Sequence, residues 1–494
     1  MTIRPAATGC RRRIRPADLA FLFAETHGEP LHVGALLVFD APPATAGWTL
    51  ADLVALYRSA SPVAPFNRIP EFPPFGSPRW LERDAVDMHY HVRHLRVPAP
   101  GGEQQLCELV QELHSEPLDR RQSLFRAFVV EGLADGGFAL YAKVHHALVD
   151  GISGITRVVR SLSSDVRDPI GPPFFASVPA GRVARPKSIA SCPARWTETL
   201  MEQARASGDV SSGAVRKMIA ALAGAPEPNT PFVAPVTPIN GPLSNGRAMA
   251  IMSLPIGVLR SIAHSQGGTI NDVVLAIVDA AMVRYLAVRG APVSRPLVAM
   301  VPVSLRARGD ADATTKASAI VSALGDPNSS PRARMRQIVE RMEAAKAEVR
   351  AMSKTAATNN AIAMYFLAVG LGSLGVRRPG VNLVVSNVPG PDGDLFLGGA
   401  RLRGLFPVSA LGARIGLNIT LVSRGEQMHM GLVSDRSQLA DPERIATLCI
   451  EALEELNAAQ MKRASSTAPK RKLASSRSRC DGSSLKHKES EARQ

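Results

Sequence analysis

Strand-like and helix-like patterns alternate from about residue 15 to residue 165. The segment "LHVGALLVF" (31–39) has the apolar and β-branched run that is typical of a buried strand. Within "EQQLCELVQELHSEPL", the apolar positions from Leu106 to Leu113 recur at the spacing of an amphipathic helix. "FRAFVVEGL" and "GFALYAKVHH" predict two strands joined by the turn "ADGG", and "SGITRVVRSLSS", from Ser153 onward, predicts a helix.

The pattern stops in the middle of the chain and then resumes. Pro, Gly, Ser and Ala accumulate from about Pro169 to Pro238, which predicts a long crossover linker. Beyond it, "NDVVLAIVDAAMVRYLA" (271–287) predicts a strong helix, while "PLVAMVPVSL" and "VNLVVSNVPGP" predict core strands. "ARMRQIVERMEAAKAEVRAM" predicts a charged, exposed helix, and "DPERIATLCIEALEELNAAQ" closes the folded part.

These elements predict an α/β (α+β) protein built from two halves. We place the N-terminal half at residues 1–168, the linker at 169–238 and the C-terminal half at 239–460. The remaining residues, 461–494, lack apolar periodicity and are rich in Ser, Lys and Arg, which predicts a disordered basic tail.

The composition indicates a folded globular protein with a positive net charge. Hydrophobic residues make up 45% of the 494 residues and charged residues 20%, which is typical of a globular protein. The net charge is +15, of which the tail carries +7 and the rest of the chain +8. A basic body suits nucleotide phosphates or anionic lipid surfaces, although ordinary solubilising charge has the same signature. No nucleic-acid partner is expected.

Cysteine usage favours a reducing cytosol. The five cysteines are far apart and form no CxxC pair, so neither a disulfide framework nor a zinc site is predicted. "RRRIRP" before "ADLAFLFAE" resembles a twin-arginine export signal only superficially, because Asp18 and Glu25 interrupt the apolar run. The most apolar stretch, "AIAMYFLAVGLGSLGV" (361–376), is too short to span a membrane and predicts a buried or interface-seeking helix.

The candidate chemistry lies in "KVHHALVDGISG" (143–154). His145 and His146 end a predicted strand, and Asp150 and Gly151 follow in a tight connection to the next helix. Imidazole titrates near neutral pH, so a histidine can take the proton of a hydroxyl or thiol. Asp150 could orient the histidine directly or hold the loop. The remaining alternatives are a metal site, which lacks the HExxH spacing and a third ligand, and a structural histidine pair.

Other common catalytic motifs are missing from the sequence. No GxSxG nucleophile elbow and no P-loop occur. "GLGSLG" (370–375) matches GxGxxG, but it follows a helix-like run and "RRPG" comes next, so we expect no dinucleotide site there.

The loop resembles the HHxxxDG signature of the CoA-dependent acyltransferase superfamily, with His145, His146, Asp150 and Gly151 in the signature positions. "PADLAFLFAETHGEPLHVGALLVFD", "LHSEPLDRRQSLFRAFVVEGL", "TINDVVLAIVDAAMVRYL", "MVPVSLR", "NLVVSNVPGP", "GLNIT" and "GLVSDRS" follow in the order typical of one branch. That branch is the bacterial wax ester synthase/acyl-CoA:diacylglycerol acyltransferases, and the resemblance covers residues 15–457. The family's usual Pro-Leu-Trp is replaced by Ser123, Leu124 and Phe125.

The resemblance implies two chloramphenicol-acetyltransferase-like halves with a substrate tunnel between them and His146 at its middle. It implies acyl transfer from acyl-CoA, a substrate rather than a cofactor, to diacylglycerol or a long-chain alcohol. His146 would be the general base, and neither a metal nor a cofactor would be needed. The alternatives are another alcohol or amine acceptor, and a non-catalytic lipid-binding relative. We expect a cytoplasmic protein peripherally associated with the inner membrane face or lipid droplets.

The resemblance also adds site residues. Asp150 is expected to hold the loop rather than contact His146, in a superfamily where it commonly pairs with an arginine. Asn271 and Asp272 form the family's ND pair, with a helix N-cap as the structural alternative. Ser386 and Asn387 are possible oxyanion donors or simply turn formers before "VPGP".

Overall fold

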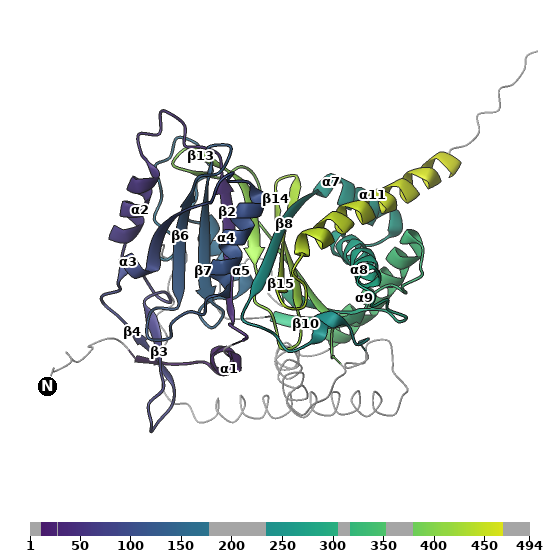
Figure 1. Cartoon of the computed structure of the whole chain (residues 1–494), viewed down its shortest axis with the longest axis horizontal. Coiled ribbons are helices and arrows are strands. Elements are labelled where there is room, and N and C mark those ends of the chain that lie inside the picture. Colours follow the sequence, from purple (N-terminus) through teal and green to yellow (C-terminus); the bar gives the residue numbers. More distant parts are fainter. Residues whose placement is uncertain (1–10, 27, 177–233, 305–316, 352–378, 468–494) are drawn as a thin grey trace, which may run out of the picture.

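The computed structural model describes residues 11–26, 28–176, 234–304, 317–351 and 379–467. Two six-stranded sheets stand side by side, with a smaller three-stranded sheet near the N-terminus (Figure 1). Each large sheet has its own hydrophobic core, and a third cluster of buried side chains lies where the two halves meet. The predicted α/β class with two halves is confirmed.

The first sheet carries the strand that leads into the histidine loop. β7 (Phe138–His145) pairs with β2 (His32–Phe39) on one side and β6 (Phe125–Glu131) on the other. All eight residues of β7 are buried, so the strand is packed on both faces up to the first histidine. After α1 (Pro16–Ala24), this half has the described helices α2 (Leu50–Ser59), α3 (Met88–His91), α4 (Glu103–Ser115) and α5 (Gly151–Val159).

The second sheet is made of β10 (Ala317–Ala323), β9 (Val298–Ser304), β11 (Leu383–Val388), β14 (Leu417–Arg424), β15 (Gln427–Asp435) and β8 (Arg247–Pro255), in that order. It packs against α7 (Ile256–Gln266), α8 (Ile270–Val288), α9 (Pro331–Ala351) and α11 (Pro442–Thr467), which lie on the right in Figure 1. The core helix is α8, most of whose side chains are buried.

The two halves exchange strands. β12 (Phe396–Leu397) and β13 (Ala400–Val408) follow β11 of the second sheet, yet they extend the first sheet, where β13 pairs with β2. β13 also lies against β14 and β15, and a Cβ on Gly431 would come within 1.8 Å of the Pro407 carbonyl oxygen. A glycine is therefore required at this close approach of the two sheets. The boundary at residue 239 does not separate the two sheets.

The third sheet brings the N-terminal arginines to the first half. β1 (Arg11–Arg13) pairs antiparallel with β4 (Arg79–Glu82), which pairs with β3 (Arg68–Glu71); β5 (Val92–Arg96) ends the first large sheet. The "RRR" run is thus an edge strand, followed directly by α1 (Pro16–Ala24).

Two sequence predictions are corrected. α9 is not simply exposed, because five of its side chains face the second core: Arg334, Met335, Ile338, Met342 and Ala345. α11 continues to Thr467, so the first residues of the predicted disordered tail are helical. The helix propagates there because Met, Lys, Arg and Ala are good helix formers. Most of the predicted linker, the apolar segment 361–376 and the rest of the tail lie outside the described residues.

Candidate active site

The histidine loop joins β7 to α5 and is held by Asp150. Asp150 is the N-cap of α5, and its Oδ1 accepts a hydrogen bond of 2.7 Å from the Ser153 amide. α5 therefore begins at Gly151, two residues before the predicted start at Ser153. An aspartate at this position satisfies a free amide of the first turn, so Asp150 holds the loop.

His145 is completely buried, and its contacts select one tautomer. The Ala147 amide donates to His145 Nδ1 at 3.0 Å, so Nδ1 is the acceptor and Nε2 carries the proton. Nε2 lies 3.4 Å from a carboxylate oxygen of Glu25. These contacts fix the orientation of the His145 ring, and a role for His145 in the reaction stays a prediction.

Glu25 connects the histidine loop to α1. Its carboxylate also accepts hydrogen bonds from the Arg120 guanidinium and the Leu31 amide. Burial alone would raise the pKa of Glu25, but His145, Arg120 and the Leu31 amide outweigh it and lower the pKa to about 2. The carboxylate is therefore ionised at neutral pH and fixes the end of α1 beside the loop.

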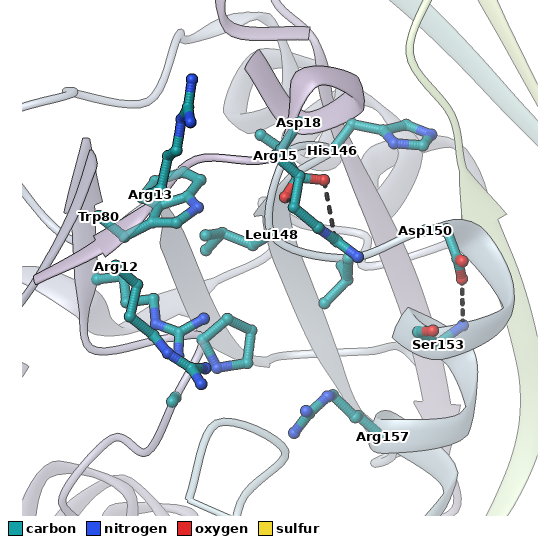
Figure 2. A pocket seen from close by; sticks show the side chains of 15 residues that line it. Arg12, Arg13, Arg15, Asp18, Trp80, His146, Leu148, Asp150, Ser153 and Arg157 are labelled. Atoms are coloured by element: carbon teal, nitrogen blue, oxygen red, sulfur yellow. Dashed lines mark hydrogen bonds and ion pairs between the residues drawn. The ribbon is translucent and has the colours of Figure 1, made fainter. Parts of the chain in front are cut away.

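His146 differs from its neighbour in orientation. Its amide donates to the Leu31 carbonyl at 2.9 Å, and its half-buried ring stacks on Phe21 of α1, with centroids 4.3 Å apart and planes 16° apart. Figure 2 shows the ring pointing away from the nearby arginines. No described residue outside His146 hydrogen-bonds either ring nitrogen, so the ring is oriented by packing alone.

The charge state of His146 suits a base. Burial lowers the pKa of its imidazole, although its own backbone carbonyl and the carboxylates of Asp150 and Asp18 favour the charged form. Because the pKa lies below the ordinary 6.5, the ring is mainly neutral at pH 7 and can accept a proton.

A cavity of about 500 Å³ borders the histidine loop (Figure 2). One wall is the loop from His146 to Asp150, continued by Ser153 and Arg157 of α5. The other walls come from β1, α1 and the third sheet, including Asp18 and Trp80. The arginines that line the cavity are Arg12, Arg13, Arg15, Arg68 and Arg157.

The ND pair lies elsewhere, at the start of α8. Thr269 is the N-cap, and it forms a capping box with Asp272, whose Oδ2 accepts from the Thr269 amide at 2.8 Å and hydroxyl at 2.7 Å. The N-cap alternative for Asn271 is therefore wrong, because the helix begins one residue earlier. Neither residue lines the cavity at His146. A role for Asn271 in the reaction stays a prediction.

The suggested oxyanion donors lie at the end of β11. Ser386 is half-buried and Asn387 is exposed, since neighbouring strand residues face opposite sides of the sheet. Val388, two residues after Ser386, packs in the same core as Val149 and Ile155 of the histidine loop and α5. Ser386 thus shares the sheet face that turns toward the first half, and Asn387 does not. Neither lines the cavity, and the oxyanion role stays a prediction.

The departure from Pro-Leu-Trp falls in a well-packed region. The Leu124 carbonyl accepts the His145 amide at 3.0 Å, which sets the register of β7. Phe125 is fully buried and stacks on His91, with centroids 4.4 Å apart. Ser123 is also buried, and its hydroxyl has no hydrogen-bond partner among the described residues. Phe125 fills the core of the first half rather than the cavity at His146.

The sequence carries no motif that marks Asp18, Phe21, Glu25 or the cavity arginines as site residues. Phe21 and Glu25 lie four residues apart on one helical stretch before β2, a spacing that also describes an ordinary amphipathic helix. Only the contacts of α1 with the loop distinguish them.

Neither a metal-binding cluster nor a helix able to cross a membrane occurs among the described residues. Within them, no three His, Cys, Asp or Glu side chains are grouped so that they could hold a metal ion. None of the described helices combines the length and apolar character that a membrane crossing requires. Cys107 and Cys449 are buried and unpaired.

Two α/β halves joined around an HHxxxDG loop define a CoA-dependent acyltransferase fold. The solved structure of the wax ester synthase/diacylglycerol acyltransferase from Marinobacter aquaeolei VT8 superposes with a TM-score of 0.73. The two chains are 29% identical, and the match covers 91% of this chain and all of that one.

The sequence comparisons define the family. Residues 14–274 match the wax ester synthase/diacylglycerol acyltransferase catalytic domain, and residues 315–457 match the WS/DGAT C-terminal domain. The probable diacylglycerol O-acyltransferase tgs2 of Mycobacterium tuberculosis is 33% identical over 451 residues, covering 90% of this chain and 98% of the relative. The O-acyltransferase WSD of Acinetobacter baylyi is 32% identical over 443 residues, covering 88% and 95%. The chain belongs to the wax ester synthase/diacylglycerol acyltransferase family.

Proposed function

We propose that this protein transfers a long-chain acyl group from acyl-CoA to the hydroxyl of diacylglycerol, of a long-chain alcohol, or of both. The observation that carries the proposal is the His146 ring, which stacks on Phe21 at the loop between β7 and α5. Its lowered pKa agrees with the part of a base. Membership of the family supports acyl transfer as the reaction.

The mechanism follows from the state of that imidazole. His146 takes the proton of the acceptor hydroxyl while the oxygen attacks the thioester carbonyl. The tetrahedral intermediate collapses, and the protonated His146 returns the proton to the departing CoA thiolate. The proton and the acyl group both come from the two substrates, so the proposed reaction needs no cofactor, metal or covalent acyl-enzyme.

Charge develops on the former carbonyl oxygen during the attack. A hydrogen-bond donor placed there in advance stabilises the transition state. Ser386 is the better candidate of the two predicted donors, because its strand face turns toward the first half. Asp150 and His145 act through the loop, by capping α5 and by joining the loop to Glu25.

The decisive experiment is CoA release by the purified protein from palmitoyl-CoA, with hexadecanol or dipalmitoylglycerol as acceptor. We expect release that requires an acceptor and falls about 10²–10⁴-fold in His146→Ala. His264→Ala, an exposed histidine on α7, is the matched control and should behave like the wild-type protein.

Other outcomes favour the alternatives. CoA release with another alcohol or an amine, but not with hexadecanol or dipalmitoylglycerol, would show that the acceptor is a different one. Acyl-CoA binding without release in any acceptor series would support a non-catalytic lipid-binding protein.

We also propose that the protein works at the cytoplasmic membrane face or on lipid droplets, because its acceptors partition into lipid. Three large apolar side chains at one end of the first half support this. Phe23 is 64% exposed, and Phe72 and Phe75, in the loop between β3 and β4, are 41% and 94% exposed. The centroids of the Phe23 and Phe72 rings lie 5.8 Å apart. The exposed arginines of β1 lie in the three-stranded sheet that also contains β3 and β4. Exposed aromatics beside basic residues favour an anionic lipid surface.

The variant Phe72→Ser/Phe75→Ser tests this surface. We expect several-fold weaker sedimentation with phosphatidylglycerol vesicles, because two apolar anchors are lost. Val288→Ser, an 81% exposed apolar residue on α8, is the control. Unchanged sedimentation of the double variant, with loss on truncation after Ala459, would assign lipid contact to the basic tail instead.

A further inference from the structure

Arginines outnumber carboxylates among the described residues that line the cavity beside the histidine loop. Five of these residues are arginines and two are aspartates, Asp18 and Asp150. Arg15 is paired with Asp18 through two hydrogen bonds of 2.8 and 2.9 Å. Arg68 is likewise paired with Glu82 at 3.0 and 2.8 Å.

Arg12 and Arg13 have no such partner within the described residues, where no carboxylate lies within ion-pair distance of either. Arg12 is opposite Trp80 in the β1–β4 register, and cross-strand partners share a sheet face. Both residues line the cavity.

Arg157 adds charge from the opposite wall. Its guanidinium carbon lies 5.4 Å from the centre of the Phe66 ring. Burial lowers the pKa of Arg157, and the nearby positive charges of Arg160 and Arg68 lower it further. Like charges held together in a cavity in this way favour the binding of an anion.

The placement fits the distribution of charge in acyl-CoA. Its phosphates are separated from the thioester by the long pantetheine arm, so a phosphate site should be remote from the reacting imidazole. Figure 2 shows Arg12 and Arg157 across the cavity from His146, with the His146 ring turned away from them. Guanidinium groups also match phosphate oxygens with two parallel hydrogen bonds.

We propose that Arg12 and Arg157 form the subsite that binds the phosphate groups of the acyl-CoA donor. This assignment rests on the proposed acyl transfer and adds to it the side from which the donor enters. The donor lies along the wall made by β1, the third sheet and α5, and its thioester extends past the histidine loop. The acceptor then approaches His146 from the side of the second half.

The test compares two donors that differ only in the nucleotide. Palmitoyl-CoA carries all the phosphates, whereas palmitoyl-pantetheine has the same thioester without any. We expect the ratio of kcat/KM for palmitoyl-CoA to that for palmitoyl-pantetheine to fall about tenfold in Arg12→Gln and in Arg157→Gln, the size of one lost charge-assisted contact. Arg260→Gln, an exposed arginine on α7, is the control and should keep the wild-type ratio. A wild-type ratio in the two cavity variants would overturn the proposal, whether or not their overall activity falls.

Direct binding separates this proposal from the proposed reaction. Adenosine 3′,5′-bisphosphate carries the 3′-phosphate and a 5′-phosphate of CoA without any acyl group. Calorimetry should show binding to the wild-type protein that weakens about tenfold in each cavity variant and weakens with added salt. If the protein bound adenosine 3′,5′-bisphosphate but transferred no acyl group, the phosphate subsite would stand and the proposed reaction would be rejected. If it did not bind the bisphosphate, the subsite would be rejected.

Lipid headgroups are the other source of phosphate. If Arg12→Gln and Arg157→Gln lost sedimentation with phosphatidylglycerol vesicles but kept the wild-type donor ratio, the arginines would serve lipid contact and the proposal would fail.

Discussion

The two adjacent histidines have different neighbours because the strand ends between them. His145 is the last residue of β7, and His146 is the first residue of the turn that follows. His145 is held between the Ala147 amide and Glu25. His146 stacks on the Phe21 ring.

At the residue scale, the lowered pKa of His146 predicts the pH dependence of the reaction. A general base must be unprotonated, so activity is lost as pH falls through the pKa of the free protein. Because that pKa lies below the ordinary 6.5, we expect the acid limb of kcat/KM to have its midpoint below pH 6.5. Rates measured from pH 5 to 8, with the fold monitored by circular dichroism, would check this. A midpoint at or above pH 7 would contradict the assignment of His146 as the base.

At the scale of elements, two helices begin with the same device. α2 starts with a capping box of Thr49 and Asp52, and α8 with one of Thr269 and Asp272. The α2 box is exposed, whereas Asp272 is buried beneath its helix. The same local chemistry therefore starts a surface helix and the central helix of the second core.

The shared device gives a matched pair of variants. We expect Thr269→Ala and Thr49→Ala each to lower the free energy of unfolding by about 1 kcal/mol, because each removes one N-cap hydrogen bond. Both should retain the wild-type kcat, since the ND pair stays in place in Thr269→Ala. Urea denaturation and steady-state rates would check these values. A loss of kcat confined to Thr269→Ala would instead show that the start of α8 takes part in the reaction.

At the scale of the whole molecule, buried neutral histidines hold the junction of the two halves. His32 Nε2 lies 2.6 Å from the His114 carbonyl, and the His114 ring contacts the Tyr141 hydroxyl and the Ser409 carbonyl. Ser409 follows β13, the strand contributed by the second half of the sequence. Arg247 of β8 crosses the same junction by donating to the Gly28 carbonyl at 2.9 Å.

The buried histidines His32, His114, His91 and His429 predict that the fold is sensitive to acid. Burial lowers the pKa of His32 far below 6.5, that of His114 to about 3, and those of His91 and His429 to about 4. The unfolded chain binds more protons below pH 6.5, so their contribution is present above pH 6.5 and is lost as pH falls toward 4. The free energy of unfolding falls by up to about 1.4 kcal/mol per histidine for each pH unit.

Urea unfolding at pH 7.5, 6 and 5 would measure this loss. In His114→Gln, the change in the free energy of unfolding with pH should correspond to about one proton fewer. A free energy of unfolding that stays constant over this range would mean that these histidines are already charged in the folded protein.

The sequence by itself determined what depends on neighbouring residues. The strand ending at His145, the turn and the start of α5 follow from a short run of apolar residues, an aspartate and a glycine, because N-caps and strand periodicity are local properties. The ordered motifs also identified the family, which the comparisons confirm. The local pattern placed the start of α5 two residues too late. It also missed the buried face of α9, because burial depends on what a helix packs against.

Only the tertiary structure decided which distant residues meet. Strand pairing is set by the backbone and by the burial of one sheet face, so nothing near β13 indicates that it leaves its own half for the first sheet. The tautomer of His145 depends on Glu25, the orientation of His146 on Phe21, and the charge of the cavity on arginines that come from β1, β3 and α5. These are contacts between segments far apart in the chain, and folding brings them together through burial rather than through any sequence motif.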